Sequence, residues 1–288
     1  MEKKYITPDM GRIMVLVPHQ DDEILLAAGI LRQAAIQGNP VCVAMVTNGD
    51  YGCPDYSKGR KRLRESIEGL KVLGLSGLHL DFLGYADTGM ANEDSFLWNL
   101  FTEKEAGAIH PSSCSDTTYG LENRDEFHKR VLGGHAPYTR TSVVTDLRLL
   151  LEKYRPDVIF TTSKWDTHGD HSGLYYFLME VLEEMKGSDS YCPQVYSGIV
   201  HSFDGDENWP LRSCVPDSFT CPECLKEGGG FGWEDRISFP VPEDMLSSVK
   251  ENNRKWRALS RHETALEPNA VDFLCSFLKA EEIFWRVR

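Results

Sequence analysis

The chain has 288 residues, of which 41% are hydrophobic, and its 31 Lys and Arg against 44 Asp and Glu give a formal charge of −13. This composition is typical of a folded globular protein, and the length allows a stable core without disulfides. The negative charge disfavours nucleic acid and anionic membranes as partners, because both recruit proteins through basic surface. No apolar run reaches the roughly 18 to 20 residues that a membrane span needs, so we expect a cytoplasmic protein without a membrane partner.

Strand and helix patterns alternate over the first 85 residues. Short apolar runs predict strands, and apolar residues at helical spacing predict helices that end at glycines. In chain order we expect a strand at 13–17, a helix at 24–35, a strand at 41–46, a helix at 60–73 and a strand at 78–83. This order favours parallel pairing with right-handed crossovers.

A long stretch, residues 84–138, interrupts the pattern and is rich in Gly, Ser, Thr and Asn. Such stretches are usually functional or carry short elements of their own. A second irregular segment, 202–232, is rich in Gly, Pro, Cys and charged residues. Around these segments we expect helices at 143–154 and 173–185, strands at 158–162 and 194–201, and final helices near 243–259 and 272–284.

No linker or repeat divides the chain, so we predict one domain, residues 1–288, with insertions at about 84–138 and 202–232. The expected fold class is α/β, with a Rossmann-like, mostly parallel sheet and helices on both faces. Ligands of such sheets bind beyond the carboxyl ends of the strands. Polar residues that follow the strands are therefore the first candidates for a functional site.

Polar residues follow the first strand as Pro18-His19-Gln20-Asp21-Asp22-Glu23. Ionisable groups directly after a buried run are costly to place near a core unless a cation compensates their charge. Alternatively, the acids could only cap the next helix and complement its dipole. The histidine favours a metal site, because His and Asp together ligate metals whereas a helix cap needs no imidazole.

A second polar cluster, Trp165-Asp166-Thr167-His168-Gly169-Asp170-His171, follows the strand expected at 158–162 and precedes a helix. A lone histidine is more often structural than ligating, but two such clusters at equivalent strand ends argue against a structural role for both. A site of two histidines and one carboxylate leaves a coordination position open for water, as catalytic zinc sites do.

Both clusters resemble signatures of the GlcNAc-phosphatidylinositol de-N-acetylase family, also called PIG-L or LmbE-like. Residues 18–23 are similar to its P-H-P-D-D-E motif, and residues 168–171 to its H-P-D-H motif. Weaker resemblances lie at 47–50, 64–65, 82–87, 155–158, Lys255, Ala258, His262 and Thr264. The chain departs from the pattern at Gln20 and Gly169, where the family has proline, and at Ala265, where glutamine is common.

The resemblance implies an LmbE-like deacetylase fold with one catalytic Zn²⁺. The implied zinc ligands are His19, Asp22 and His171. Asp21 would be the general base, His168 would polarise the acyl carbonyl, and Asp170 would orient a histidine. The implied reaction is attack of metal-activated water on an N-acetyl group of an N-acetylglucosamine-type sugar or glycoside, with release of acetate. Because adjacent aspartates point in different directions, one can bind metal while its neighbour faces the water.

Substrate contacts are less well marked. Arg64, Asp87 and Tyr119 are candidates for hydrogen bonds to sugar hydroxyls, although each could equally be a surface or structural residue. Phe96 and Trp98 could stack on a sugar, but aromatic residues in an insertion more often form a small core. The two irregular segments, 84–138 and 202–232, are expected to set specificity for an aglycone that the sequence does not identify.

Eight cysteines are spread over the chain, and we expect most of them to be reduced. Cys221-Pro-Glu-Cys224, with Cys214 seven positions earlier, could form a second, structural zinc site whose fourth ligand would be Cys192 or His201. A single Cys-x-x-Cys motif is only moderately specific, so this second zinc is the less favoured alternative.

Two other classes of function stay open at this point. Metal-dependent phosphoesterases also gather Asp and His at strand ends, although generally around two metals. A non-catalytic sugar- or metal-binding protein is the other alternative, but it would not need Asp21 and His168, and both are present. The favoured interpretation has a small amino-sugar substrate as partner, and the chain could form a homo-oligomer.

Overall fold

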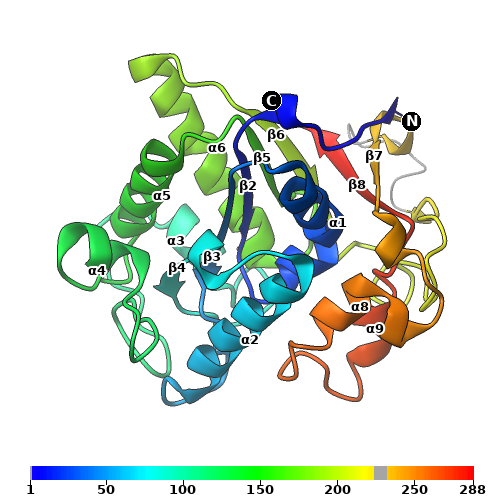
Figure 1. Ribbon diagram of the computed structural model, residues 1–288. Coiled ribbons are helices and arrows are strands. Elements are labelled where there is room, and N and C mark those ends of the chain that lie inside the picture. The colour runs from blue at the N-terminus through cyan, green and yellow to red at the C-terminus, as the bar shows by residue number, and fades with distance from the viewer. Residues whose placement is uncertain (1, 224–231) are drawn as a thin grey trace.

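The computed structural model describes residues 2–223 and 232–288. Within these residues an eight-stranded sheet has the order β1-β7-β8-β6-β5-β2-β3-β4, and helices cover both of its faces (Figure 1). Strands β2 to β6 pair in parallel, whereas β8 is antiparallel to β6 and β7. The predicted fold class, a Rossmann-like and mostly parallel α/β sheet, is confirmed.

The strands are β1 Glu2–Lys3, β2 Ile13–Val17, β3 Val41–Thr47, β4 Leu80–Tyr85, β5 Val158–Thr162, β6 Gln194–Gly198, β7 Ile237–Pro240 and β8 Glu281–Arg286. The α-helices are α1 Asp22–Gln37, α2 Ser57–Leu73, α3 Phe96–Thr102, α4 Phe127–Leu132, α5 Arg140–Tyr154, α6 Gly169–Asp189, α8 Arg254–Leu259 and α9 Val271–Cys275. Short 3-10 helices lie at Pro8–Met10, Gly77–His79, Trp233–Asp235, Glu243–Met245 and Lys250–Asn252. Among the described residues, no helix has the length and apolar character to cross a membrane.

The central strand β2 divides the core into two layers. Its side chains alternate between the two faces of the sheet, as they do in any strand. Ile13, Val15 and Val17 pack in the layer that includes α1, α2, α8 and α9, whereas Met14 and Leu16 pack in the layer of α3, α5 and α6. Because both faces are buried, the strand is continuously apolar, which is the pattern from which it is predicted.

The end of the chain differs from the sequence prediction. The helix expected at 272–284 stops with α9 at Cys275, and Glu281–Arg286 forms strand β8 instead. Ile283, Phe284 and Trp285 are all buried where β8 pairs with β6 and β7. Such β-branched and aromatic residues favour strands when a partner is available, so non-local pairing overrides the helical spacing. The helix expected near 243–259 is also broken, because 3-10 turns precede the short α8.

The insertion at 84–138 packs against the sheet through its aromatic residues. Phe96 lies edge-on to Tyr138 with ring centroids 5.0 Å apart, and Trp98 contacts Tyr176 of α6 at 5.9 Å. Phe96 is also buried in the core layer of α3, α5 and α6. These contacts favour the structural alternative for both aromatics over stacking on a sugar.

A buried ion pair between Lys255 and Glu282 satisfies backbone groups at a break in α1. The helix loses its regular geometry at Ala27, whose φ is −136°. Glu282 of β8 accepts hydrogen bonds from two backbone N–H groups just after the break, at 2.8 and 3.0 Å. Lys255 of α8 donates to the carbonyl of Leu25 before it, at 2.8 Å, and to Glu282 at 2.9 Å. The pair thus satisfies donors and acceptors that the break leaves without helical partners.

Substitution of Lys255 by Met should destabilise the fold by about 3–5 kcal/mol, because it leaves the buried Glu282 carboxylate without its counter-ion. Urea denaturation followed by circular dichroism measures this change. Lys71→Met is the matched control, because Lys71 pairs with Glu68 on the surface with 54% of its side chain exposed, and it should shift stability by less than about 1 kcal/mol. Equal midpoints for the two variants would show that the ion pair does not support the fold.

Candidate metal centre and active site

The two polar clusters meet at the carboxyl ends of neighbouring strands. Strand β2 leads into residues 18–23 and β5 leads into residues 163–171, and these strands pair directly. Strand β3 lies on the other side of β2, so the chain leaves the two strands toward opposite edges of the sheet. Ligand sites of parallel sheets form at such switch points.

Three donor atoms from these clusters surround one point. His19 Nδ1 and His171 Nε2 each lie 3.3 Å from Asp22 Oδ2, and the two nitrogens are 3.2 Å apart. A tetrahedral zinc site with bonds of about 2.0–2.1 Å separates its ligand atoms by about 3.3 Å. All three side chains are buried. The structure therefore brings the predicted ligands together at a spacing that fits zinc.

His168 is a second candidate for the third ligand. His19, His168 and His171 each present a ring nitrogen within 4.8 Å of the others. We favour the set with Asp22, because its atoms are closer together and because the Nδ1 atom of His168 already accepts the Asp170 backbone N–H at 3.2 Å. A carboxylate also compensates the charge of a divalent cation, which a third imidazole does not.

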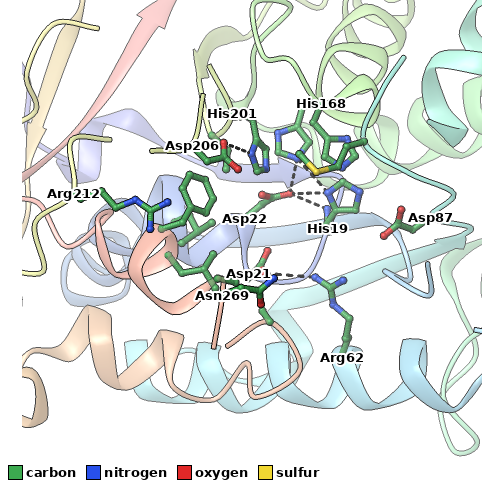
Figure 2. Close-up of a pocket in the computed structure, with 18 residues that line it drawn as sticks. His19, Asp21, Asp22, Arg62, Asp87, His168, His201, Asp206, Arg212 and Asn269 are labelled. Atoms are coloured by element: carbon green, nitrogen blue, oxygen red, sulfur yellow. Dashed lines mark hydrogen bonds and ion pairs between the residues drawn. The ribbon is translucent and has the colours of Figure 1, made fainter. Parts of the chain in front are cut away.

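The two adjacent aspartates point in different directions because the backbone at Asp21 is unusual. Its φ is +101°, a conformation that costs a non-glycine residue on the order of 1–3 kcal/mol. The Asp21 N–H donates to the Glu23 carboxylate at 2.9 Å, which helps to hold the turn. As Figure 2 shows, Asp22 turns toward the histidines whereas Asp21 turns toward Arg62, with 3.6 Å between their charged atoms.

Each ligand histidine is held by a carboxylate on its other nitrogen. Asp170 Oδ2 lies 3.0 Å from His19 Nε2, and Asp166 Oδ2 lies 3.0 Å from His171 Nδ1. Such outer carboxylates orient the rings and raise their affinity for metal. Asp170 is the residue for which the sequence predicts this role, and it lies within hydrogen-bond distance of His19. No role is predicted for Asp166 from the sequence. A second candidate histidine ligand nevertheless implies a second carboxylate that orients its ring.

The buried acids make the site favourable for positive charge. Burial disfavours an imidazolium, but the Asp170 and Asp22 carboxylates outweigh it and raise the pKa of His19 to about 10. Asp166 and Asp22 likewise raise the pKa of His171 well above its usual value, against the effect of burial. A divalent cation bound by neutral histidines would satisfy the same demand for positive charge.

His168 differs from the other two histidines. Burial, together with the positive charge of His19, lowers its pKa, so the imidazole is neutral. Its Nδ1 accepts a hydrogen bond from the Asp170 N–H. The proton of the neutral ring must then lie on Nε2, which makes His168 a hydrogen-bond donor through that atom.

Two of the three departures from the family motifs, Gln20 and Gly169, are explained by contacts with neighbouring segments. Gln20 donates its side-chain amide to the Thr47 carbonyl at 2.7 Å and so links the ends of β2 and β3. Gly169 donates its N–H to the Met90 carbonyl at 2.8 Å, a bond that proline cannot make. A Cβ atom at Gly169 would also lie only 2.5 Å from Ser95 Oγ. Glycine at this position therefore allows both the hydrogen bond to Met90 and the close packing against Ser95 of the insertion.

These side chains open into a pocket of about 400 Å³. Its lining includes the three candidate metal ligands together with Asp21 and His168. Ala265, which the motif comparison marks, also lines the pocket. Further lining residues, which no sequence motif indicated, are Arg62, Met90, His201, Asp206, Arg212, Asn269, Ala270, Phe273 and Leu274. Residues after α8 thus join the two insertions in shaping the pocket.

Only one of the three predicted substrate-binding residues lies at the pocket. Asp87 lines it, and its backbone N–H donates to Asp50 at 2.9 Å. Tyr119 is buried away from it and donates its hydroxyl to Asp50, also at 2.9 Å. Arg64 is exposed and pairs with Glu122 instead.

Of the two arginines in this part of α2, Arg62 rather than Arg64 lines the pocket. Successive residues of a helix point about 100° apart, so a shift of two positions turns the side chain to the opposite face. The family's R-x-x-E spacing fits Arg62 and Glu65, whereas Arg64 is adjacent to Glu65. Strict use of that spacing would have identified the correct residue.

The structure does not bring the predicted ligands of the second zinc site together among the described residues. Cys214 forms a disulfide with Cys275, so its thiolate cannot bind metal. His201 lines the main pocket, and Cys192 is exposed next to Arg288. Cys224 lies outside the described residues. The cysteine-rich segment is therefore fixed by a covalent link to α9.

The sequence profile of the PIG-L: GlcNAc-PI de-N-acetylase family matches residues 14–182, more than half of the chain. The chain belongs to this family. Similar solved structures include N,N'-diacetylchitobiose deacetylase from Pyrococcus horikoshii, with 14% identity and a TM-score of 0.55 over 97% of this chain and 84% of that one. The zinc-inhibited form of teicoplanin deacetylase Orf2 has 16% identity and a TM-score of 0.52 over 96% of this chain and 97% of that one. At these identities the likeness shows a shared fold. No curated protein matches the sequence.

The match to the PIG-L family confirms the predicted resemblance and covers residues 14–182. Both polar clusters lie inside residues 14–182, whereas β6, β7 and β8 follow them. The pocket residues His201, Asp206, Arg212 and Asn269 are also outside the matched range. One part of the pocket thus lies within the matched residues, and the opposite wall lies outside them.

Replacement of Asp166 by Asn should weaken zinc affinity by roughly 10- to 100-fold, because it removes the carboxylate that orients His171. Competition with a chromogenic chelator measures the affinity. Asp206→Asn is the matched control, because Asp206 lies 2.9 Å from His201, which is outside the ligand set. If Asp166→Asn bound zinc as tightly as the wild type, the assignment of Asp166 would fail.

Proposed function

We propose that this PIG-L family member is a zinc-dependent N-deacetylase. It would remove the N-acetyl group of an N-acetylglucosamine-type sugar or glycoside and release acetate. The observation that carries the proposal is the meeting of His19 Nδ1, Asp22 Oδ2 and His171 Nε2 at 3.2–3.3 Å in a pocket that also contains Asp21 and His168. The two similar structures, a chitobiose deacetylase and a teicoplanin deacetylase, support the same class of reaction.

Zinc would be held by His19, Asp22 and His171. When bound, it supplies a Lewis acid that polarises the amide carbonyl and makes water a better nucleophile near neutral pH. Asp166 and Asp170 keep the two imidazoles oriented, so their free nitrogens face the same point. The chain's own contribution is thus a rigid ligand set with its outer nitrogens already satisfied.

Asp21 is suited to be the general base. Burial raises its pKa to about 6, although Arg62 opposes the shift. A base with a pKa near the working pH both accepts and returns a proton efficiently. Asp21 would take a proton from the attacking water as the C–O bond forms and deliver it to the amide nitrogen as the C–N bond breaks. The products are then acetate and a free amine.

His168 would stabilise the negative charge that develops on the carbonyl oxygen. Its neutral ring carries the proton on Nε2, since Nδ1 accepts the Asp170 N–H. Because the Asp170 N–H and the surrounding residues hold the ring, little reorganisation is needed when the charge appears. Donors fixed in this way stabilise a tetrahedral oxyanion more than water does.

A two-metal phosphoesterase fits the site less well. Two-metal sites hold their ions roughly 3.5–4 Å apart with separate ligands. The other possible ligand group found among the described residues, His19, Asp87 and Asp170, shares His19 with the first group. Asp170 is also already bonded to that histidine. One cation is therefore the occupancy that these residues support.

Release of acetate from N-acetylglucosaminides, compared with release of phosphate from phosphomonoesters, tests the function directly. Purified protein is stripped of metal, supplied with zinc and incubated with both substrate sets. Acetate and free amine, with activity lost on chelation and restored by zinc, support the deacetylase. Phosphate release without acetate would favour the phosphoesterase, and tight zinc binding without either product would favour a binding protein.

Asp22→Asn and Asp21→Asn should separate the ligand from the base. Asp22→Asn should lose zinc, whereas Asp21→Asn should keep zinc and lose turnover by roughly 10²-fold or more. Zinc content is measured by elemental analysis and turnover by amine release. Asp9→Asn serves as the control, because Asp9 is exposed, belongs to neither cluster and does not line the pocket. Full activity of zinc-loaded Asp21→Asn would exclude Asp21 as the base.

The single-domain organisation, the cytoplasmic location and the homo-oligomer stay predictions from the sequence.

A further inference from the structure

Two arginines line the pocket, and only one of them is bonded to the site. Arg62 donates to the Gln20 carbonyl at 2.7 Å and to the Gly49 carbonyl at 3.2 Å, and it lies 3.6 Å from the Asp21 carboxylate. Arg212 has no ion pair or hydrogen bond of its side chain with any residue in 2–223 or 232–288. Figure 2 shows Arg212 on the wall across from His19 and Asp87.

The backbone around Arg212 is nevertheless firmly anchored. Trp209, three residues earlier, is almost fully buried and stacks on Phe219 with ring centroids 5.1 Å apart. The Leu211 carbonyl accepts a hydrogen bond from the buried Lys279 ammonium at 3.3 Å. Two residues later, Cys214 is joined to Cys275 of α9. The chain therefore fixes the position of Arg212 while its guanidinium stays available.

Two acids of the same segment, Asp206 and Asp217, are already engaged by other groups. Asp206, on the same segment and the same wall, lies 2.9 Å from His201 Nδ1. Asp217 pairs with Lys279 at 2.6 Å. In a chain with 44 acidic residues against 31 basic ones, an arginine that lines a pocket without an acidic partner is well placed for a negative group of a ligand.

We propose that Arg212 binds an anionic group, a carboxylate or a phosphate, on the aglycone of the substrate. This inference rests on the proposed deacetylase function and specifies its substrate as an acidic N-acetylglucosaminide. Guanidinium binds such planar or tetrahedral oxyanions through paired N–H donors. The N-acetyl group would lie at the cluster of His19, Asp22 and His171, and the anion at the opposite wall, so Arg212 would orient the glycoside as well as select it.

Matched glycosides test this assignment. Three N-acetylglucosaminides with the same aglycone chain are compared, ending in a carboxylate, its methyl ester or a phosphate monoester. For the wild type, kcat/KM should be roughly 10- to 100-fold higher for the better of the two acidic substrates than for the ester. This ratio is the scale of a hydrogen bond to a charged group. The carboxylate and phosphate arms show which anion the site prefers.

Variants of Arg212 then assign the preference to one side chain. Arg212→Gln should lower the ratio of kcat/KM for the acid to kcat/KM for the ester to about one, and Arg212→Lys should retain part of the preference. Arg64→Gln is the matched control, because Arg64 is exposed and pairs with Glu122 outside the pocket. Equal kcat/KM for acids and ester in the wild type, or an unchanged preference in Arg212→Gln, would overturn the proposal.

Failure of the deacetylase function can be recognised separately. If no glycoside releases acetate with zinc supplied, the proposed reaction is wrong, and calorimetric binding of the same three glycosides still tests Arg212. Tighter binding of an acid than of the ester, lost in Arg212→Gln, supports the anion site without reference to turnover. Absence of that preference in the binding data overturns it.

Discussion

Burial of several carboxylates at the carboxyl ends of two neighbouring strands, β2 and β5, is the constraint on which the rest of this structure depends. Asp22, Asp166 and Asp170 are each almost completely enclosed, and a buried carboxylate is stable only when positive charge or hydrogen-bond donors surround it. The fold meets this demand with the rings of His19 and His171, which the acids in turn hold by their outer nitrogens. The arrangement needed to bury the acids is thus the arrangement that presents two imidazoles and a carboxylate to a cation.

That arrangement requires a rigid support, which the end of the chain supplies. The site contains a turn with φ of +101° at Asp21, and such a conformation persists only where neighbouring contacts overdetermine it. Helix α1 starts at this turn and breaks five residues further on, at Ala27. Lys255 and Glu282, from elements more than 200 residues away in sequence, satisfy the broken segment. The C-terminal strand β8 therefore stabilises the segment that carries Asp22.

The local sequence pattern predicted the parallel strands and the positions of the two polar clusters well. The expected strand at 158–162 has the bounds of β5, and both polar clusters lie where their strands end. Predictions that depend on the direction of a side chain were less successful, because one shift within the R-x-x-E spacing moves an arginine from the pocket to the surface. Asp166 could have been inferred from the need of a second histidine for a carboxylate. Strand β8 and the wall formed by His201, Arg212 and Asn269 depend on contacts between distant segments, which periodicity does not report.

Some residues that line the pocket lie within the family match and others, including Arg212, lie outside it. This division also changes what the net charge of the chain implies for a ligand. A formal charge of −13 suggests that acidic ligands would be repelled. Surface charges are screened over about 8–10 Å at physiological ionic strength, so most of that charge acts weakly inside the pocket. What a ligand meets there is a candidate cation site, in which buried acids lie beside the histidines, and, at the wall, an arginine held by buried neighbours. Net repulsion would slow the approach of an acidic glycoside, whereas the local contact with Arg212 would decide whether it stays bound.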